Sequence, residues 1–150
     1  MDTVKNFNPY YAPADFRAYV YDAIVLAWET KRVDILTSTF NKKTLENICG
    51  LYVLRVNKLS DVQWRDQGSW PTGEFLIFHS DGRGYECLFK RLRDTFAHGH
   101  YGQSKRGWIT VRHRYQNPRE KVENTRVFGN LKITTLKKLV TFLDTSNSTE

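Results

Sequence analysis

Four stretches of the chain repeat apolar residues every three or four positions, which is the period of an α-helix. They cover residues 16–27, 45–56, 85–96 and about 134–143. An amphipathic helix must bury its apolar side against another element, and several such helices can cover one another. The pattern therefore predicts a mainly α fold in which the helices pack as a bundle.

Polar residues and a glycine mark the ends of the predicted helices. The candidate N-terminal caps of the first three helices are Asp15, Asn41 or Thr44, and Ser80 or Asp81. Gly99 comes directly after His98, and glycine commonly takes the left-handed conformation that stops a helix. We therefore expect the third helix to end at His98.

A later segment, residues 108–115, has the period of a strand. Its residues alternate between one side, with Ile109, Val111 and Tyr115, and a solvent-facing side, with Trp108, Thr110, Arg112 and Arg114. Asn117-Pro118 is a turn signal, and residues 125–129 favour a returning strand. The sequence thus predicts a small β-hairpin inserted before the C-terminal helix. The apolar run 75–78 is expected to form one or two helical turns, with a strand as the alternative.

Length and cysteine usage indicate the broad class of protein. A chain of 150 residues is the size of one domain, predicted over residues 1–145 with a frayed tail at 146–150. Cys49 and Cys87 are too few for a disulfide scaffold and have no metal-ligand spacing, so we expect reduced thiols and no metal or other cofactor. No apolar run approaches the roughly 20 residues that cross a bilayer. We therefore expect a cytoplasmic protein without a membrane partner.

The positive charge of the chain is concentrated in one segment. The net charge is +7, and residues 83–119 hold nine lysines and arginines against two acidic residues, a surplus equal to the whole net charge. Such a segment suggests a polyanionic partner, which in this chain we take to be RNA. The alternative is a solvated basic face without a ligand.

Within this segment, Arg93 and His98 are the residues best suited to chemistry. Imidazole exchanges a proton near neutral pH, and a guanidinium offers a planar set of donors to phosphate. Metal-free RNA cleavage requires a group that moves the 2′-hydroxyl proton and a group that stabilises charge on the phosphate. Five positions along a helix place the two side chains about 140° apart. They can converge at the helix end, or across a two-fold homodimer.

The segment Leu-Arg-Asp-Thr-Phe-Ala-His-Gly at 92–99 resembles the signature of HEPN-domain proteins. That signature has an arginine, a polar residue, three more residues and a histidine at the end of a late helix. HEPN domains are all-helical and usually dimeric, and many are metal-independent ribonucleases of toxin–antitoxin and antiphage defence systems. The resemblance implies a HEPN-like helical bundle, a homodimer, and an antitoxin or other regulatory protein as a partner.

The resemblance also implies a role for each residue of the motif. Arg93 would contact the scissile phosphate, His98 would transfer a proton, and Asp94 would orient one of them. Cleavage of single-stranded RNA would leave a 2′,3′-cyclic phosphate and a 5′-hydroxyl, with no metal required. His100 lies at a spacing that the family also allows and is the alternative catalytic histidine.

Neighbouring basic and aromatic side chains are candidates for binding RNA. They are Arg91, Lys90, His100, Tyr101, Arg112 and Arg114. For the two hairpin arginines, Arg112 and Arg114, the alternative is that they discourage edge pairing of an exposed hairpin. For the whole protein, the alternative is a non-catalytic HEPN-like module that binds RNA or another protein.

Overall fold

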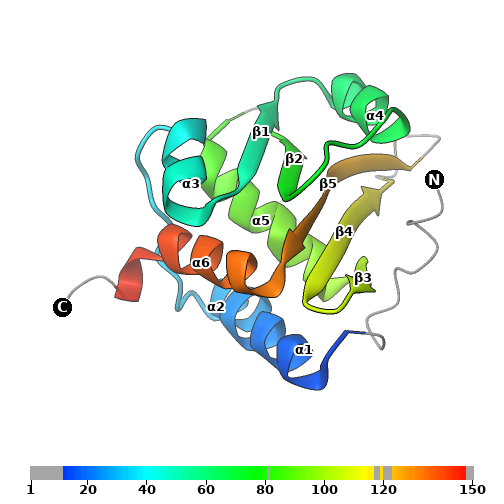
Figure 1. The fold of residues 1–150 in the computed structure, drawn as a ribbon. Coiled ribbons are helices and arrows are strands. Elements are labelled where there is room, and N and C mark those ends of the chain that lie inside the picture. Colours follow the sequence, from blue (N-terminus) through cyan, green and yellow to red (C-terminus); the bar gives the residue numbers. More distant parts are fainter. Residues whose placement is uncertain (1–11, 81, 117–118, 120–122, 148–150) are drawn as a thin grey trace.

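A computed structural model describes residues 12–80, 82–116, 119 and 123–147. Within these residues, five strands form one mixed sheet that has helices on both faces (Figure 1). The strands are β1 (Tyr52–Val56), β2 (Phe75–His79), β3 (Tyr101–Lys105), β4 (Trp108–Tyr115) and β5 (Asn124–Lys132). The helices are α1 (Ala14–Val20), the π-helix η3 (Tyr21–Leu26), α2 (Ala27–Glu29), α3 (Lys42–Cys49), α4 (Leu59–Gln67), α5 (Gly84–Ala97), α6 (Ile133–Leu143) and the 3₁₀-helix η4 (Thr145–Asn147).

This architecture is an α/β fold, so the prediction of a mainly α, HEPN-like helical bundle is wrong. The error begins in the second apolar stretch, where the predicted helix 45–56 stops halfway. Gly50 takes a left-handed conformation with φ of 70° and ends α3, and β1 follows at Tyr52. The start of α3 agrees with the prediction, because the side chain of Asn41 accepts a hydrogen bond from the Thr44 amide at 3.2 Å.

The strand order in the sheet is β1-β2-β5-β4-β3. β1 and β2 are parallel, and the other neighbours are antiparallel. In this register, Val56 pairs with His79, Phe78 pairs with Val127, and Val127 also pairs with His113. The carboxyl ends of β1, β2 and β4 therefore meet the amino ends of β5 and β3 at one end of the sheet. We call this the polar end.

The two faces of the sheet are covered unequally. The larger core lies between one face and helices α1, η3, α3, α5 and α6. The smaller core lies on the other face, where Val62 of α4 and the half-buried Trp70 pack against Phe75, Ile77 and Phe128. Figure 1 shows α4 at the top, apart from the other helices.

The burial of β2 explains why the sequence pattern did not indicate a sheet. Leu76 and Phe78 point into the larger core, whereas Phe75 and Ile77 point into the smaller one. A strand that is buried on both faces is apolar at every position and has no alternation to detect. Residues 75–78 therefore form the strand that was the alternative to helical turns.

The other predicted elements have mixed outcomes. The first and third helices, the antiparallel pair of β4 and β5, and the last helix are present, and Gly99 has φ of 70° beyond the end of α5. Asp15 lies in the first turn of α1, whose N-cap is Pro13. The N-cap of α5 is Arg83 rather than Ser80, and Asp81, Asn117-Pro118 and residues 148–150 lie outside the described residues.

The segment that follows α2 is joined to the segment that follows α6. The amide of Leu36 donates to the carbonyl of Leu143 at 2.9 Å, and the amide of Thr145 donates to the carbonyl of Asp34 at 2.8 Å. Between them, Ile35 and Asp144 form an isolated antiparallel bridge. These bonds tie residues about one hundred positions apart in the sequence, so the first and last helices are held as one layer.

Candidate functional site

Three histidines gather where α5 ends, at the polar end of the sheet. His98 directly follows α5, His100 precedes β3, and His113 lies near the end of β4. The ring centroids of His98 and His113 are 5.4 Å apart with an interplanar angle of 21°, and those of His100 and His113 are 4.9 Å apart. We call these three residues the histidine cluster.

Backbone geometry fixes the cluster. Gly99 turns the chain out of α5, after which the amide of His100 donates to the carbonyl of Thr95 at 2.9 Å. The carbonyl of His100 in turn accepts from the amide of Arg112 on β4 at 3.2 Å. His100 is thus held by both α5 and β4, which places its ring against His113.

Burial differs among the three imidazoles. His113 is 3% exposed, His100 is half-buried, and His98 is exposed. The Nδ1 atoms of His100 and His113 lie 2.9 Å apart, and a hydrogen bond between them requires that one of these atoms carries no proton. The Nδ1 atom of His98 lies 2.8 Å from the carbonyl oxygen of Asp94, which can only accept, so Nδ1 donates there. The Nε2 atom of His98 is then the nitrogen available to exchange a proton with a ligand.

The surroundings favour the neutral forms of two imidazoles, those of His113 and His100. Burial first, and then the nearby charges of His100, His98, Arg91 and Arg126, together lower the pKa of His113 to about 3. Burial also lowers the pKa of His100, helped by His98 and opposed by Glu123. At neutral pH, His100 is therefore an uncharged base.

Two arginines lie beside the cluster. The Nε atom of Arg91 donates to the carbonyl of His79 at 3.2 Å, and its Nη2 atom lies 3.2 Å from the His79 Nδ1 atom. The guanidinium of Arg126 lies over the ring of Tyr115, 5.3 Å from its centroid. Both positive charges are close enough to His113 to lower its pKa. The polar end thus combines a neutral base with fixed positive charge.

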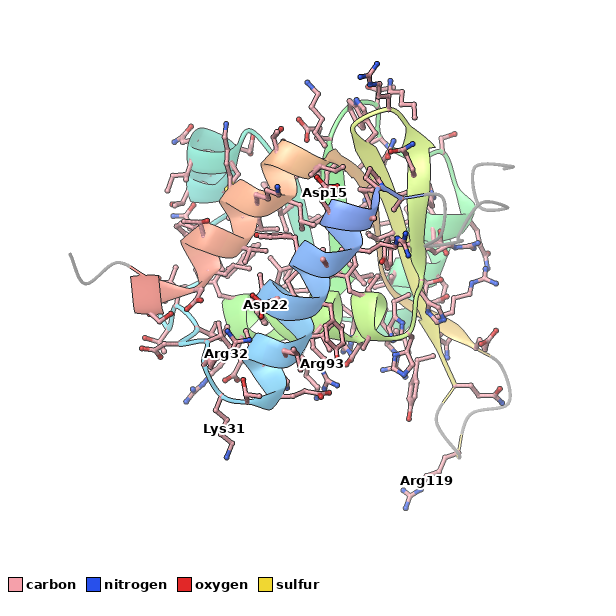
Figure 2. The ribbon with its side chains drawn as sticks, turned by 90° about the horizontal axis from the view of Figure 1, so that it is seen from below. Asp15, Asp22, Lys31, Arg32, Arg93 and Arg119 are labelled. Carbon is pink, nitrogen blue, oxygen red and sulfur yellow. The ribbon has the colours of Figure 1, made fainter. Side chains whose placement is uncertain are left out.

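Arg93 lies on a different side of α5 from His98, as the helical offset predicts. Its guanidinium lies over the ring of Trp28, 5.8 Å from the centroid, and its Nη1 atom is 3.8 Å from the carboxylate of Glu29. Its Nε atom is 3.2 Å from the carboxylate of Asp94. Figure 2 shows Arg93 beside the helix formed by α1, η3 and α2. Within one chain, Arg93 and His98 therefore do not meet.

The remaining predicted site residues are spread over several surroundings. Asp94 contacts both members of the motif, Arg93 through its carboxylate and His98 through its carbonyl. Lys90 is exposed and lines a cavity with Trp28 on the outer side of α5. Arg114 is also exposed.

Tyr101 is placed in the core rather than at a surface that RNA reaches. It is 4% exposed, and its ring packs 4.9 Å from Phe96 and 6.0 Å from Phe16. Its burial raises the pKa of its phenol, an effect that Arg17 opposes. The structure therefore buries Tyr101 among apolar side chains, away from the exposed basic side chains.

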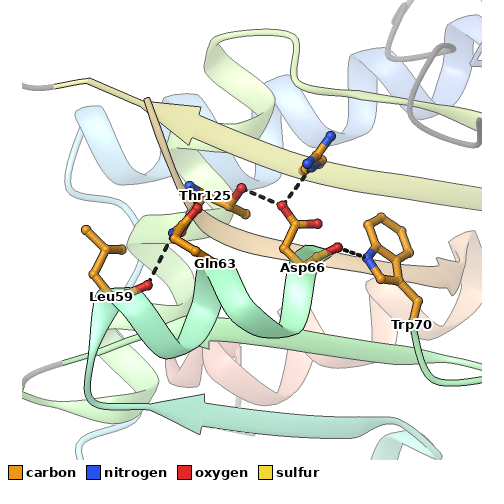
Figure 3. Close-up of polar contacts among 6 residues, drawn as sticks. Leu59, Gln63, Asp66, Trp70 and Thr125 are labelled. Atoms are coloured by element: carbon orange, nitrogen blue, oxygen red, sulfur yellow. Dashed lines mark hydrogen bonds and ion pairs between the residues drawn. The ribbon is translucent and has the colours of Figure 1, made fainter. Parts of the chain in front are cut away.

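Arg112 points to the opposite face of the sheet, where it forms an ion pair under α4. Its Nε atom donates to Asp66 Oδ2 at 2.9 Å, and the hydroxyl of Thr125 donates to the same oxygen at 2.6 Å (Figure 3). The side chains of Arg112 and Asp66 are 11% and 2% exposed. The Arg112 guanidinium is engaged in this ion pair, so it connects β4 to α4 and does not face the histidine cluster.

Sequence reasoning did not include His113 or Arg126 in the site. A signal for His113 was present, because it shares the alternation of residues 108–115 with Ile109 and Val111 and so belongs to the inner side of the strand. Arg126 carried no such signal. It lies near His113 because β5 pairs with β4, a pairing that the predicted hairpin contained.

Comparison with models of known protein families, with curated proteins and with solved structures finds no match. The resemblance of residues 92–99 to the HEPN signature therefore rests on those residues alone. In the part of the chain that the structure describes, no group of three or more His, Cys, Asp or Glu side chains is arranged to hold a metal ion. None of the described helices combines the length and apolar character needed to cross a membrane.

Proposed function

We propose that this protein is a metal-independent endoribonuclease whose catalytic site is the histidine cluster. The observation that carries the proposal is the close contact of the His98, His100 and His113 rings beside the positive charges of Arg91 and Arg126. Two imidazoles can supply both proton transfers of RNA transesterification, so this chemistry needs no metal-bound water. The basic segment that includes the site supplies attraction for the phosphate backbone.

His100 and His98 divide the two proton transfers. Neutral His100 accepts the proton of the 2′-hydroxyl as its oxygen forms a bond to phosphorus. The bond from phosphorus to the 5′-oxygen breaks, and protonated His98 donates a proton to that leaving oxygen through Nε2. The products are a 2′,3′-cyclic phosphate and a 5′-hydroxyl. Proton exchange with water then restores both rings.

His113 and the arginines support these steps. Buried and neutral, His113 holds the His100 ring through the bond between their Nδ1 atoms. Arg91 and Arg126 stabilise the charge that develops on the phosphate oxygens. The proposed site is built from one chain and does not require a dimer. The homodimer, the antitoxin or regulatory partner, the defence role and the cytoplasmic location therefore stay predictions from the sequence.

Cleavage of single-stranded RNA in excess EDTA tests the proposal. We expect the wild type to produce 2′,3′-cyclic phosphate ends, and a substrate with 2′-deoxyribose at the cleaved position to remain intact. His98→Ala and His100→Ala should each lower kcat by at least about 100-fold. Lys43→Ala, which removes an exposed charge on α3 outside the basic segment 83–119, is the matched surface control and should retain activity.

The leaving group separates the roles of the two histidines. A nucleoside 3′-(4-nitrophenyl phosphate) expels a nitrophenolate that needs no proton, so His98→Ala should regain most of the wild-type rate on it. His100→Ala should remain slow on the same substrate, because the 2′-hydroxyl still requires a base. If the wild type binds RNA but cleaves none of a varied set of sequences, the protein is the non-catalytic RNA-binding module instead.

A further inference from the structure

A second basic feature lies at the junction of β1 and α4. A groove of about 450 Å³ is lined there by Arg55, Lys58, Asp61, Trp64 and Arg65, among others. The indole of Trp64 is 73% exposed, the largest exposure of any large apolar side chain among the described residues. The guanidinium of Arg65 lies 5.9 Å from its ring centroid. We call this feature the Trp64 groove.

The composition of the Trp64 groove fits a nucleotide. An exposed indole offers a flat face on which a nucleobase stacks, and neighbouring cations contact the backbone. The described residues of the lining include three basic side chains (Arg55, Lys58 and Arg65) and one acidic side chain (Asp61), and all four are exposed. A partner that docked through apolar side chains would leave these charges poorly solvated, whereas a polyanion with aromatic bases complements both features.

The groove and the histidine cluster share the polar end of the sheet. Lys58 lies two residues beyond Val56, which pairs with His79, and His113 lies three strands away on β4. At about 4.8 Å between neighbouring strands, the crossing from β1 to β4 is about 15 Å. The groove opens beside α4, whereas the cluster lies on the α5 side, so a ligand that reaches both passes over the strand ends.

Basic side chains occupy the interval between the two features. Arg91 contacts His79 at the end of β2, and Arg126 lies on β5, the next strand along the sheet. A backbone that crosses the polar end therefore meets positive charge at each strand from the groove to the cluster. This continuity favours a flexible single strand over a duplex, because the bases must leave a stack to lie on an indole.

We infer that the Trp64 groove binds a nucleobase and phosphate of single-stranded RNA, a few nucleotides from the phosphate held at the histidine cluster. The position of the Trp64 groove relative to the cleaved bond rests on the proposed function, whereas the binding of a nucleotide in the groove does not. Trp64 on this account is a substrate-binding residue and takes no part in bond cleavage.

Binding is tested by fluorescence anisotropy with a 5′-labelled ten-nucleotide RNA, using full-length protein that carries His98→Ala. We expect Trp64→Ala to raise Kd about tenfold and Trp64→Phe to retain most of the affinity, because a phenyl ring also stacks. Tyr21→Ala is the matched control, since Tyr21 is 57% exposed on η3, away from the groove, and should leave Kd unchanged. Circular dichroism melts check that each variant is folded.

Cleavage kinetics place the groove relative to the reacting phosphate. With the ten-nucleotide RNA, Trp64→Ala should raise KM about tenfold with little change in kcat. With a dinucleotide, which is too short to span both features, wild type and Trp64→Ala should have equal KM and kcat. Equal loss on both substrates would overturn the separation of groove and cluster.

The two proposals can fail independently. If no RNA is cleaved but Trp64→Ala still weakens binding tenfold, the groove stands and the nuclease assignment falls. If RNA is cleaved and Trp64→Ala has the same Kd as Tyr21→Ala, the groove assignment is wrong and the nuclease assignment stands. Failure of the wild type to bind the ten-nucleotide RNA overturns the groove assignment as well.

Discussion

The guanidinium of Arg93 and the imidazole of His98 leave the end of α5 on different sides. Arg93 lies over Trp28 between two carboxylates, whereas His98 stacks on His113 with their ring centroids 5.4 Å apart. The positive charges near the cluster are supplied instead by Arg91 and Arg126. The two halves of the HEPN-like motif thus have separate surroundings within one chain.

Substitution of the two kinds of arginine should have different effects. Arg126→Ala removes a charge beside the cluster and should lower kcat/KM for RNA about 100-fold. Arg93→Ala removes the contact with Trp28 and should lower the free energy of unfolding by about 1 kcal/mol while changing the cleavage rate only a few-fold. Initial rates and urea titrations measure the two effects.

A homodimeric composite site predicts a contrary result for Arg93. In that case Arg93→Ala would abolish cleavage, and a mixture of Arg93→Ala with His98→Ala would regain activity through heterodimers. Light scattering reports whether the protein is a dimer under the conditions of the assay.

Stability should decrease as the pH falls, because His113 is buried in its neutral form. The unfolded chain takes up this proton near the ordinary histidine value of about 6.5, whereas the folded protein takes it up at about 3. Between these values the unfolded state binds more protons, so the contribution of His113 is present above pH 6.5 and is lost toward pH 3. At pH 4.5 the expected loss from this group is about 3 kcal/mol.

Urea titrations at pH 7 and pH 4.5 measure this effect. His113→Gln retains a polar side chain without an imidazole, so its stability should change less between the two pH values than that of the wild type. The same decrease in both proteins would assign the pH dependence to other groups.

The buried ion pair between Asp66 and Arg112 should be sensitive to the loss of one partner. Asp66→Ala leaves the guanidinium of Arg112, on an 11% exposed side chain, without its carboxylate, and removes the acceptor of the Thr125 hydroxyl. We expect a loss of about 3–5 kcal/mol in the free energy of unfolding. Asp66→Asn keeps an acceptor and should cost less. Gln67→Ala, an exposed change on the same helix, should stay within about 0.5 kcal/mol of the wild type.

Gly129 should tolerate no side chain. A Cβ atom at this position of β5 would lie 2.2 Å from the carbonyl oxygen of Phe75 on the neighbouring strand, a contact that only a shift of backbone relieves. Gly129→Ala should therefore unfold cooperatively at a much lower temperature than the wild type, or fail to fold. Gly82→Ala, where a Cβ atom meets nothing within 4 Å, is the control and should melt with the wild type.

The elements that have only one buried side could be predicted from the sequence. α5 and α6 have one apolar stripe each, and β4 alternates, so their periods are readable. β1 and β2 have apolar side chains on both faces, and only the partner strands decide between strand and helix. The apolar residues of α4 are Leu59, Val62 and Trp64, and of these only Val62 is buried, so the helix has no apolar stripe to detect.

The candidate site was predictable to a similar extent. The end of α5 just before His98 followed from Gly99, and the offset of Arg93 followed from helix geometry. The joining of His100 to His113 depends on the pairing of β3 with β4, and the approach of Arg126 depends on β5. The pairing of β4 with β5 was part of the predicted hairpin, whereas the pairing of β3 with β4 is a tertiary contact that the predicted fold did not contain.

The bonds between residues 34–36 and 143–145 determine when this chain can finish folding. A nascent chain leaving the ribosome presents α1, η3 and α2 first, yet their layer is closed only by the last helix and the residues after it. β5, which completes the middle of the sheet, is also made late. This domain therefore cannot complete its native contacts before residue 145 has left the ribosome, and until then part of its aromatic interior lacks its cover.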